Sequence, residues 1–127
     1  MRCEIAGPAG RLEGLIEPGT ATTPEHPQGR PRAVVVIAHP HPEYGGTMHT
    51  KAVYHAARGF TRIGCAVLRF NFRGVGSSAG RYDGGPGERL DFEAALDYAA
   101  SAYPGVPMWA GGMSFGAWIA LSAGAAD

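Results

Sequence analysis

The sequence predicts an α/β domain with an open, mostly parallel, twisted sheet and an N-terminal antiparallel hairpin. The run at residues 33–38 is continuous, rich in β-branched residues and lacks polar alternation, as is typical of a strand buried on both faces of a sheet, and the run at 65–70 is expected to be a second buried strand. Stretches of helical length separate the predicted strands, and the 20 Gly and 10 Pro cluster in the connections. Alternating strands and helices favour a parallel sheet with right-handed crossovers.

The first half of the chain predicts a hairpin, a loop, a strand and a helix. The hairpin pairs residues 3–6 with 11–17 across Gly7-Pro8-Ala9-Gly10. Residues 18–31 contain four Pro and two Gly and form an exposed loop, and the strand at 33–38 is expected at the centre of the sheet. A helix is expected over residues 47–62, and its inward positions are Met48, Ala52, His55, Ala56 and Gly59.

The second half predicts two further strands and two helices. The strand at 65–70 leads into a Gly-rich loop at 73–87 and then a helix at 88–102, which Pro104 ends. A short strand at 106–111 and an apolar helix at 115–126 follow. The inward positions expected on the helix at 88–102 are Leu90, Ala94, Leu96 and Tyr98.

Composition excludes several classes of function. The 127 residues allow one domain, and 11 basic against 11 acidic residues leave no basic face for a nucleic acid. The longest apolar stretch, at 33–38, is far shorter than the roughly 20 residues that span a bilayer, and the start of the chain lacks the apolar core of a signal peptide. We therefore expect a cytoplasmic protein that binds no nucleic acid and no membrane. Cys3 and Cys65 are expected to be reduced thiols without a catalytic role.

The pattern G-x-S-x-G marks a candidate nucleophile, and it occurs twice. At Gly112-Met113-Ser114-Phe115-Gly116 it follows a predicted strand and leads into a helix, whose N-terminal amides favour an oxyanion. The glycines are expected because side chains there would collide where strand and helix pack, while the serine takes strained backbone angles.

The second copy of the pattern is Gly76-Ser77-Ser78-Ala79-Gly80. It leads into residues 81–86, a segment with two Gly and a Pro that cannot form a helix. Context therefore assigns Ser114 as the nucleophile and Ser78 as a loop or capping serine.

Acyl transfer also needs two backbone N–H donors for the oxyanion. Phe115, the residue after the nucleophile, supplies one. The loop after the strand at 33–38 should supply the other, and its prolines have no N–H. His41 is the preferred donor in this loop, with Tyr44 and Gly45 as alternatives.

Two further motifs invite cofactor chemistry that the sequence does not favour. His39 and His41 form an H-x-H pair that could chelate zinc, but no third ligand lies at metal-site spacing, so we expect loop-shaping hydrogen bonds and no metal. Gly74-Val75-Gly76 lacks the third glycine and the helix of a dinucleotide loop. Arg73 is expected to hold its turn through hydrogen bonds to carbonyls. No cofactor is predicted.

Three motifs together resemble the α/β-hydrolase superfamily. They are His39-Pro40-His41-Pro42 with Gly45-Gly46-Thr47-Met48, then residues 70–78, then residues 112–117. Their order and spacing resemble those of small, lidless bacterial hydrolases akin to dienelactone hydrolase and the serine aminopeptidase-like group. The resemblance implies a serine hydrolase of small acyl substrates, such as an esterase, and leaves the substrate open because the superfamily cleaves esters, thioesters, lactones, amides and peptides.

The chain departs from the superfamily in its catalytic triad. The fold orders the triad Ser, then Asp or Glu, then His, but all five histidines precede Ser114 and the only acid after it is Asp127. Residues 1–127 therefore resemble an incomplete, N-terminal part of one α/β-hydrolase domain with the C-terminal strands, acid and base missing. The fragment itself is expected to be inactive, because an unassisted serine is a weak nucleophile.

Two alternatives stay open: a non-catalytic, hydrolase-like binding module, and one half of a domain split between chains. A missing neighbour strand would leave the edge of the strand at 106–111 bare, so self-association through this edge is a further expectation.

Overall fold

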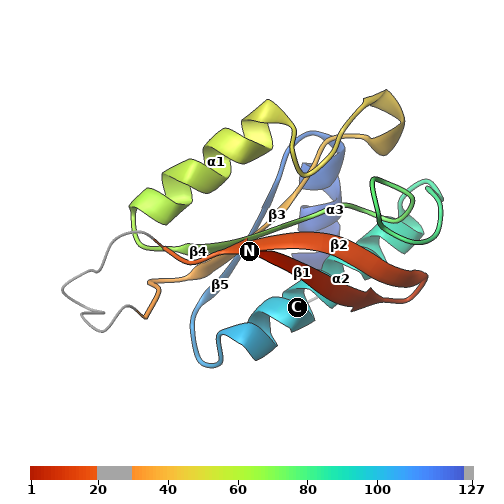
Figure 1. Ribbon diagram of the computed structural model, residues 1–127. Helices are drawn as coiled ribbons and strands as arrows, with labels where there is room; N and C mark the ends of the chain where they lie inside the picture. The colour runs from red at the N-terminus through yellow and green to blue at the C-terminus, as the bar shows by residue number, and fades with distance from the viewer. Residues whose placement is uncertain (20–29, 125–127) are drawn as a thin grey trace.

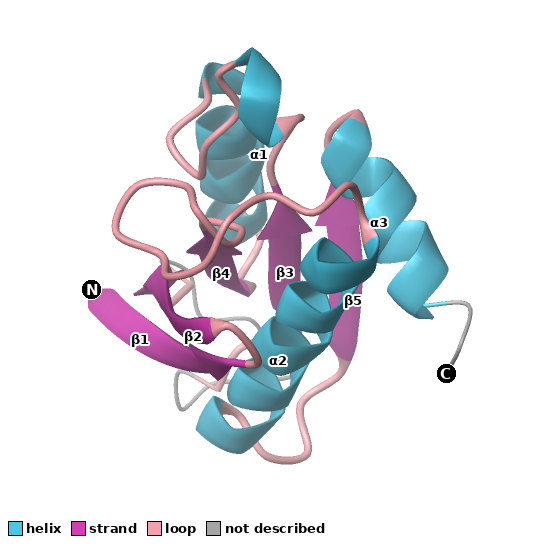
Figure 2. Cartoon of the chain, turned by 90° about the vertical axis from the view of Figure 1, so that its right-hand side faces the viewer, coloured by secondary structure: helices cyan, strands magenta, loops and turns pink. Residues whose placement is uncertain are grey.

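The computed structural model describes residues 1–19 and 30–124, which form one sheet with helices on both faces (Figures 1 and 2). Helix α1 covers one face, and helices α2 and α3 pack together on the other. In chain order the elements are β1 (Arg2–Gly7), β2 (Gly10–Glu17), β3 (Val34–Ala38), the 3-10 turn η1 (Pro42–Tyr44), α1 (Lys51–Arg62), β4 (Ala66–Phe70), α2 (Pro86–Ala102), β5 (Met108–Gly112) and α3 (Phe115–Gly124).

The α/β class and the opening hairpin are as predicted, and the sheet is mixed. Its strand order is β1-β2-β4-β3-β5. The pairs β4-β3 and β3-β5 are parallel, whereas β1-β2 and β2-β4 are antiparallel. The hairpin extends the sheet beyond β4, so β4 is the middle strand of the five and the expectation of β3 at the centre was wrong by one strand. Strand β3 is still paired on both sides.

The alternation of side chains along β3 divides the core between the two faces of the sheet. Val34, Val36 and Ala38 join the cluster under α2 and α3, while Val35 and Ile37 join the cluster under α1. All five β3 residues and all five β4 residues are buried. This burial explains why β3 lacks polar alternation. The one charged residue of β4, Arg69, is buried and donates to the Met48 carbonyl and to Glu17 Oε1, both at 2.8 Å.

Helix α1 begins four residues later than predicted, at Lys51. The hydroxyl of Thr50 accepts from the Thr47 N–H at 3.0 Å, and the hydroxyl of Thr47 accepts from the His49 N–H at 3.0 Å. These side-chain bonds compete with helical backbone bonds, so residues 47–50 form a turn. Met48 is buried within this turn.

The buried face of α1 is also different from the prediction. Val53, Ala57 and Thr61 are its buried residues, Ala56 is half-buried, and the predicted inward positions Ala52, His55 and Gly59 are exposed. The buried face thus lies one residue along the chain from the predicted one, because Val53 and Ala57 pack against the core beneath α1.

The remaining boundaries differ by at most two residues. Helix α2 begins at Pro86, which suits the first turn of a helix, and β5 occupies Met108–Gly112 instead of 106–111. Leu96 is buried and Ala94 and Tyr98 pack against the core, but Leu90 is 47% exposed, contrary to the prediction. Most of the predicted loop at 18–31 lies outside the described residues, as do residues 125–127.

Two other predictions concern the cysteines and membranes. Cys3 and Cys65 are free thiols, and burial raises the pKa of each. Within residues 1–19 and 30–124, no helix has the length and apolarity required to cross a bilayer.

Candidate active site

Ser114 lies in a sharp turn between β5 and α3. Its φ of 57° is the only positive value at a non-glycine residue of the described chain, and its side chain is exposed. The turn is fixed from both sides, because the Met113 N–H donates to the Ala38 carbonyl at 3.1 Å and the Gly116 N–H donates to the Met113 carbonyl at 2.9 Å. A left-handed serine at a strand-to-helix turn is the strained geometry that the sequence pattern predicts.

The two glycines flanking Ser114 are required by space. A Cβ on Gly112 would lie 2.4 Å from the carbonyl carbon and oxygen of Gly116. A Cβ on Gly116 would lie 2.4 Å from the Ala38 oxygen and 2.5 Å from the His39 oxygen. In each case the obstacle is backbone, which cannot rotate aside. The turn at Gly112–Gly116, called the elbow below, therefore packs directly on the end of β3.

The two predicted oxyanion donors lie on neighbouring loops. The rings of His41 and Phe115 are 5.0 Å apart between centroids. In the described part of the chain, neither backbone N–H has an acceptor, so both are free to bind a ligand oxygen. The Tyr44 N–H donates to the His41 carbonyl at 3.1 Å, which removes Tyr44 as the alternative donor. Gly45 stays an alternative.

The two imidazoles of the H-x-H pair hold the loop after β3. His39 is fully buried; its Nδ1–H donates to the Pro40 carbonyl at 2.7 Å, and its Nε2 accepts from the Phe72 N–H at 3.1 Å. Burial lowers the pKa of His39 from 6.5 to about 4, so the ring is neutral at neutral pH. The Nδ1 of His41 accepts from the Glu43 N–H at 3.1 Å.

These bonds leave little capacity for a metal at the pair. Each ring uses its unprotonated nitrogen to accept a backbone N–H, so that lone pair is not available to a cation. Among the described residues, no group of three or more His, Cys, Asp or Glu side chains could hold a metal ion.

Ser78, the serine of the second G-x-S-x-G copy, has a different environment. It is buried; its hydroxyl accepts from the Glu13 N–H at 2.9 Å and donates to the Asn71 carbonyl at 2.8 Å. Glu13 Oε1 also accepts from Asn71 Nδ2 and the Ser77 N–H, both at 2.9 Å, and this backbone bond is the main reason that the pKa of Glu13 is lowered. Ser78 thus joins the hairpin to the loop after β4, consistent with the structural role predicted for it.

Arg73 anchors the same loop to α2, mainly through carboxylates and only partly through the predicted carbonyl contacts. Its Nε and Nη2 donate to the two carboxylate oxygens of Asp91 at 3.1 and 2.9 Å, and Nη2 also donates to the Gly87 carbonyl at 2.9 Å. The Asp91 side chain is fully buried. A buried bidentate pair of this kind fixes the loop to the helix.

Sequence reasoning missed an aromatic cluster beside Ser114. Tyr82, from the loop after β4, has its ring centroid 5.0 Å from His41 and 5.9 Å from Phe115. The Tyr82 hydroxyl lies 3.0 Å from His41 Nε2. A single tyrosine in a Gly-rich loop gives no local signal, because its partners lie 41 and 33 positions away in the sequence.

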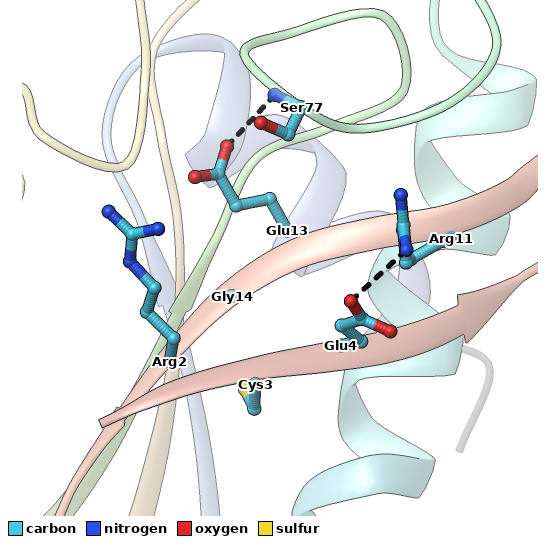
Figure 3. A pocket seen from close by; sticks show the side chains of 7 residues that line it. All are labelled: Arg2, Cys3, Glu4, Arg11, Glu13, Gly14 and Ser77. Atoms are coloured by element: carbon cyan, nitrogen blue, oxygen red, sulfur yellow. Dashed lines mark hydrogen bonds and ion pairs between the residues drawn. The ribbon is translucent and has the colours of Figure 1, made fainter.

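A polar hollow of about 340 Å³ lies on the hairpin, away from the elbow (Figure 3). Arg11 donates to Glu4 across it at 3.2 Å, and both side chains are about two-thirds exposed. Ser114 does not line it, and two of its charged side chains, Arg11 and Glu4, already form an ion pair. Its lining residues are Arg2, Cys3, Glu4, Arg11, Glu13, Gly14 and Ser77.

The described residues supply no partner for the Ser114 hydroxyl. The rings of His39 and His41 are bonded within their own loop, and no described imidazole or carboxylate is hydrogen-bonded to Ser114. His26 and Asp127 lie outside the described residues.

One protein family matches most of this chain. The family model "Serine aminopeptidase, S33" matches residues 29–127. A Rickettsia prowazekii protein of uncharacterised function is 44% identical over 116 residues, which are 91% of this chain and 45% of that protein.

Two solved structures share both the sequence and the fold. An α/β serine hydrolase homologue from Coxiella burnetii is 38% identical with a TM-score of 0.87, covering 96% of this chain and 55% of its own. A Xanthomonas campestris member of the α/β serine hydrolases without a lid is 35% identical with a TM-score of 0.90, covering 99% of this chain and 56% of its own. The chain thus spans about half the length of these relatives. By its sequence and its fold, the chain belongs to the serine aminopeptidase S33 family within the α/β-hydrolase superfamily.

Proposed function

We propose that a complete protein carrying this sequence is a serine hydrolase that acts on small ester, thioester or amide substrates through an acyl-enzyme at Ser114. The observation that carries the proposal is the left-handed φ of 57° at Ser114, in a turn whose flanking glycines admit no side chain. Such strain persists only where the surroundings impose it, and it presents the hydroxyl at the end of the sheet.

The chemistry follows from the groups around Ser114. Its Oγ attacks the substrate carbonyl carbon and its proton passes to a general base, while the N–H groups of Phe115 and His41 donate to the oxyanion. Collapse of the tetrahedral intermediate breaks the bond to the alcohol, thiol or amine, which leaves with a proton. Water then attacks the acyl-enzyme, releasing the acid and restoring Ser114.

The general base and its orienting acid come, in this proposal, from residues outside this chain. Because the rings of His39 and His41 are engaged in the loop after β3, they are poorly suited to take the Ser114 proton. We therefore expect residues 1–127 alone to be catalytically silent, with reactivity lower by several orders of magnitude than in a complete hydrolase.

Fluorophosphonate labelling tests the proposal. In a complete hydrolase that carries this sequence, we expect labelling and hydrolysis of p-nitrophenyl acetate, both lost in Ser114→Ala and both kept in Ser78→Ala. Circular dichroism confirms that each variant is folded. Hydrolysis that survives Ser114→Ala would exclude Ser114 as the nucleophile, and an inert wild type would favour the non-catalytic binding module.

A second experiment addresses a domain split between chains. Residues 1–127 are mixed with the C-terminal half of the Xanthomonas relative and labelling is measured again. Labelling that appears only in the mixture and requires Ser114 would support a split domain, whereas labelling of residues 1–127 alone would show that a base is already present.

A further inference from the structure

Three rings, two from loops and one from the first residue of α3, meet at the end of the parallel strands. His41 follows β3, Tyr82 follows β4 and Phe115 follows β5. Their centroids are separated by 5.0 Å for His41–Tyr82, 5.0 Å for His41–Phe115 and 5.9 Å for Tyr82–Phe115. Two of these residues supply the proposed oxyanion donors through their backbone. Tyr82 has no such role, and its hydroxyl is the polar group that reaches another ring of the triangle.

The hydrogen bonds of His41 define its tautomer. A backbone N–H can only donate, so the bond from Glu43 N–H requires that His41 Nδ1 be unprotonated. The neutral ring then carries its proton on Nε2, which faces the Tyr82 hydroxyl at 3.0 Å. Tyr82 is therefore the acceptor of the Nε2 proton. His39 has the opposite tautomer, with its proton on Nδ1.

The tautomer of His41 affects the backbone that His41 itself contributes. Its Nδ1 caps the 3-10 turn η1, and its carbonyl accepts from both the Tyr44 N–H at 3.1 Å and the Gly46 N–H at 3.0 Å. Rotation or protonation of the ring would break the cap. The cap and the carbonyl bonds together hold the His41 backbone at the start of η1, so the ring contributes to fixing the residue that carries the N–H.

The groups that face this cluster keep Tyr82 a neutral phenol. Desolvation, then the carboxylates of Glu43 and Glu88, raise the pKa of Tyr82, with smaller effects from Tyr44 and Asp83. Phe115 adds no charge.

We propose that Tyr82 is a positioning residue, whose hydroxyl accepts the Nε2 proton of His41 and so holds the His41 N–H in place beside that of Phe115. This inference rests on the proposed function for its catalytic meaning. The contact joins residues 41 positions apart, so it ties the loop after β4 to the loop that carries the oxyanion donor.

Tyr82→Phe tests the contact because it keeps the ring and removes only the acceptor. In ¹⁵N-labelled residues 1–127, the wild type should show a His41 Nε2–H resonance protected from exchange with water. In Tyr82→Phe we expect that resonance to be lost and the backbone amide resonances of His41 and Glu43 to shift. Tyr44→Phe is the matched control: its ring also contacts His41, at 4.8 Å, its amide is already bonded to the His41 carbonyl, and both resonances should be unchanged.

In a complete hydrolase the same variant should slow fluorophosphonate labelling of Ser114 by about 10-fold, less than the 10²–10³-fold cost of deleting a whole oxyanion donor. Retention of the protected resonance, an unmoved His41 amide, or unchanged labelling would each overturn the positioning role. If the wild type labels no faster than Ser114→Ala, the proposed function fails, and the NMR result alone then decides whether Tyr82 holds His41.

Discussion

The two copies of G-x-S-x-G occupy opposite kinds of environment. At the elbow, Ser114 has the left-handed φ, is exposed, and has no side-chain partner among the described residues. In the loop after β4, Gly76 and Gly80 take the positive φ values, 54° and 84°, while Ser78 is buried and bonded on both sides. The positive φ is at the serine in one copy and at the two glycines in the other.

This difference shows that one sequence pattern can satisfy two separate physical demands. Gly112 and Gly116 are glycine because backbone occupies the space where a Cβ would be. Gly76 and Gly80 are glycine because L-residues rarely adopt their φ, and the atoms that a Cβ would meet there, Glu13 Oε1 at 2.6 Å and Ala9 Cβ at 2.9 Å, belong to side chains and not to backbone. A hydroxyl left without partners at a strained turn is suited to chemistry, whereas a hydroxyl with both its donor and acceptor bonded to the backbone is suited to structure.

The largest effect should come from adding a methyl group at each kind of glycine. Gly116→Ala would bring Cβ to 2.4 Å from the Ala38 oxygen, and we expect it to lower the free energy of unfolding by about 3 kcal/mol, near the upper end for overpacking. Gly80→Ala should cost about 1–2 kcal/mol from its left-handed φ, and its Cβ would meet only side-chain atoms, with the Cβ of Ala9 at 2.9 Å. Urea unfolding of the two variants measures both. If both variants lost the same free energy of unfolding, the steric constraint at Gly116 and the φ constraint at Gly80 would not distinguish the two copies of the pattern.

Strand positions were the most predictable part of the fold. The β-branched run at 33–38 and the mainly apolar run at 65–70 place β3 and β4 to within a residue, and the context of Ser114 identifies the elbow. The start of α1 was not predictable from periodicity, because the hydroxyls of Thr47 and Thr50 compete with the helix.

The hydrogen-bonded network of Glu13, Asn71 and Ser78 was likewise not predictable from local sequence patterns. Glu13, Asn71 and Ser78 meet only through the pairing of the hairpin with β4, across 58 to 65 residues of sequence. Tyr82 has the same limitation. Sequence periodicity predicts which face of an element is buried, but contacts between distant loops depend on strand order.

Acid should weaken the loop on which the elbow rests. The pKa of His39 is about 4 in the folded protein, against an ordinary value of 6.5 in the unfolded chain. Between these two pH values the imidazole is protonated in the unfolded chain but neutral in the folded protein. The free energy of unfolding therefore includes the full contribution of the neutral His39 ring above about pH 6.5, and this contribution is lost as the pH falls toward 4. We expect the free energy of unfolding to fall by about 3 kcal/mol in total, because each pH unit of difference between the two pKa values corresponds to about 1.4 kcal/mol.

Urea unfolding at a series of pH values tests this window. Burial raises the pKa of Glu88, which acts with the opposite sign and partly offsets the loss, whereas the lowered pKa of Glu13 adds to the loss only at lower pH, as that carboxylate titrates. His39→Gln should flatten the dependence between about pH 6.5 and about pH 5. An unchanged slope in that variant would assign the acid sensitivity elsewhere.

Removing the two serine hydroxyls should separate stability from reactivity. Ser78→Ala leaves the Glu13 N–H and Asn71 carbonyl without their partner, so we expect a loss of about 2 kcal/mol. Ser114→Ala removes an exposed, unbonded hydroxyl and should change the free energy of unfolding by less than about 0.5 kcal/mol. Thermal unfolding compares the two directly. A larger loss in Ser114→Ala would reverse the roles assigned to the two copies.

The smallest effect concerns the edge of the strand that leads to the elbow. Strand β5 pairs with β3 and has no second neighbour among the described residues, and Met108 is 41% exposed on it. We propose that residues 1–127 associate through this edge at tens of micromolar, a range in which unpaired edges aggregate. Light scattering should show Met108→Lys smaller than the wild type, whereas Leu90→Lys, on α2, should match the wild type. A monomeric wild type would refute the proposal.

The two kinds of glycine also predict how the sequence can drift. Asn and Asp tolerate a left-handed backbone, and the atoms that a Cβ would meet at Gly76 and Gly80 belong to side chains. In distant homologues these two glycines can therefore be replaced where the neighbouring side chains also change. At Gly112 and Gly116 every side chain, including alanine, meets a fixed backbone atom. Among distant homologues we therefore expect the glycines at 76 and 80 to vary and those at 112 and 116 to be kept. A search for G-x-S-x-G, which finds two candidates in this sequence, would then find only the copy at 112–116 in most homologues.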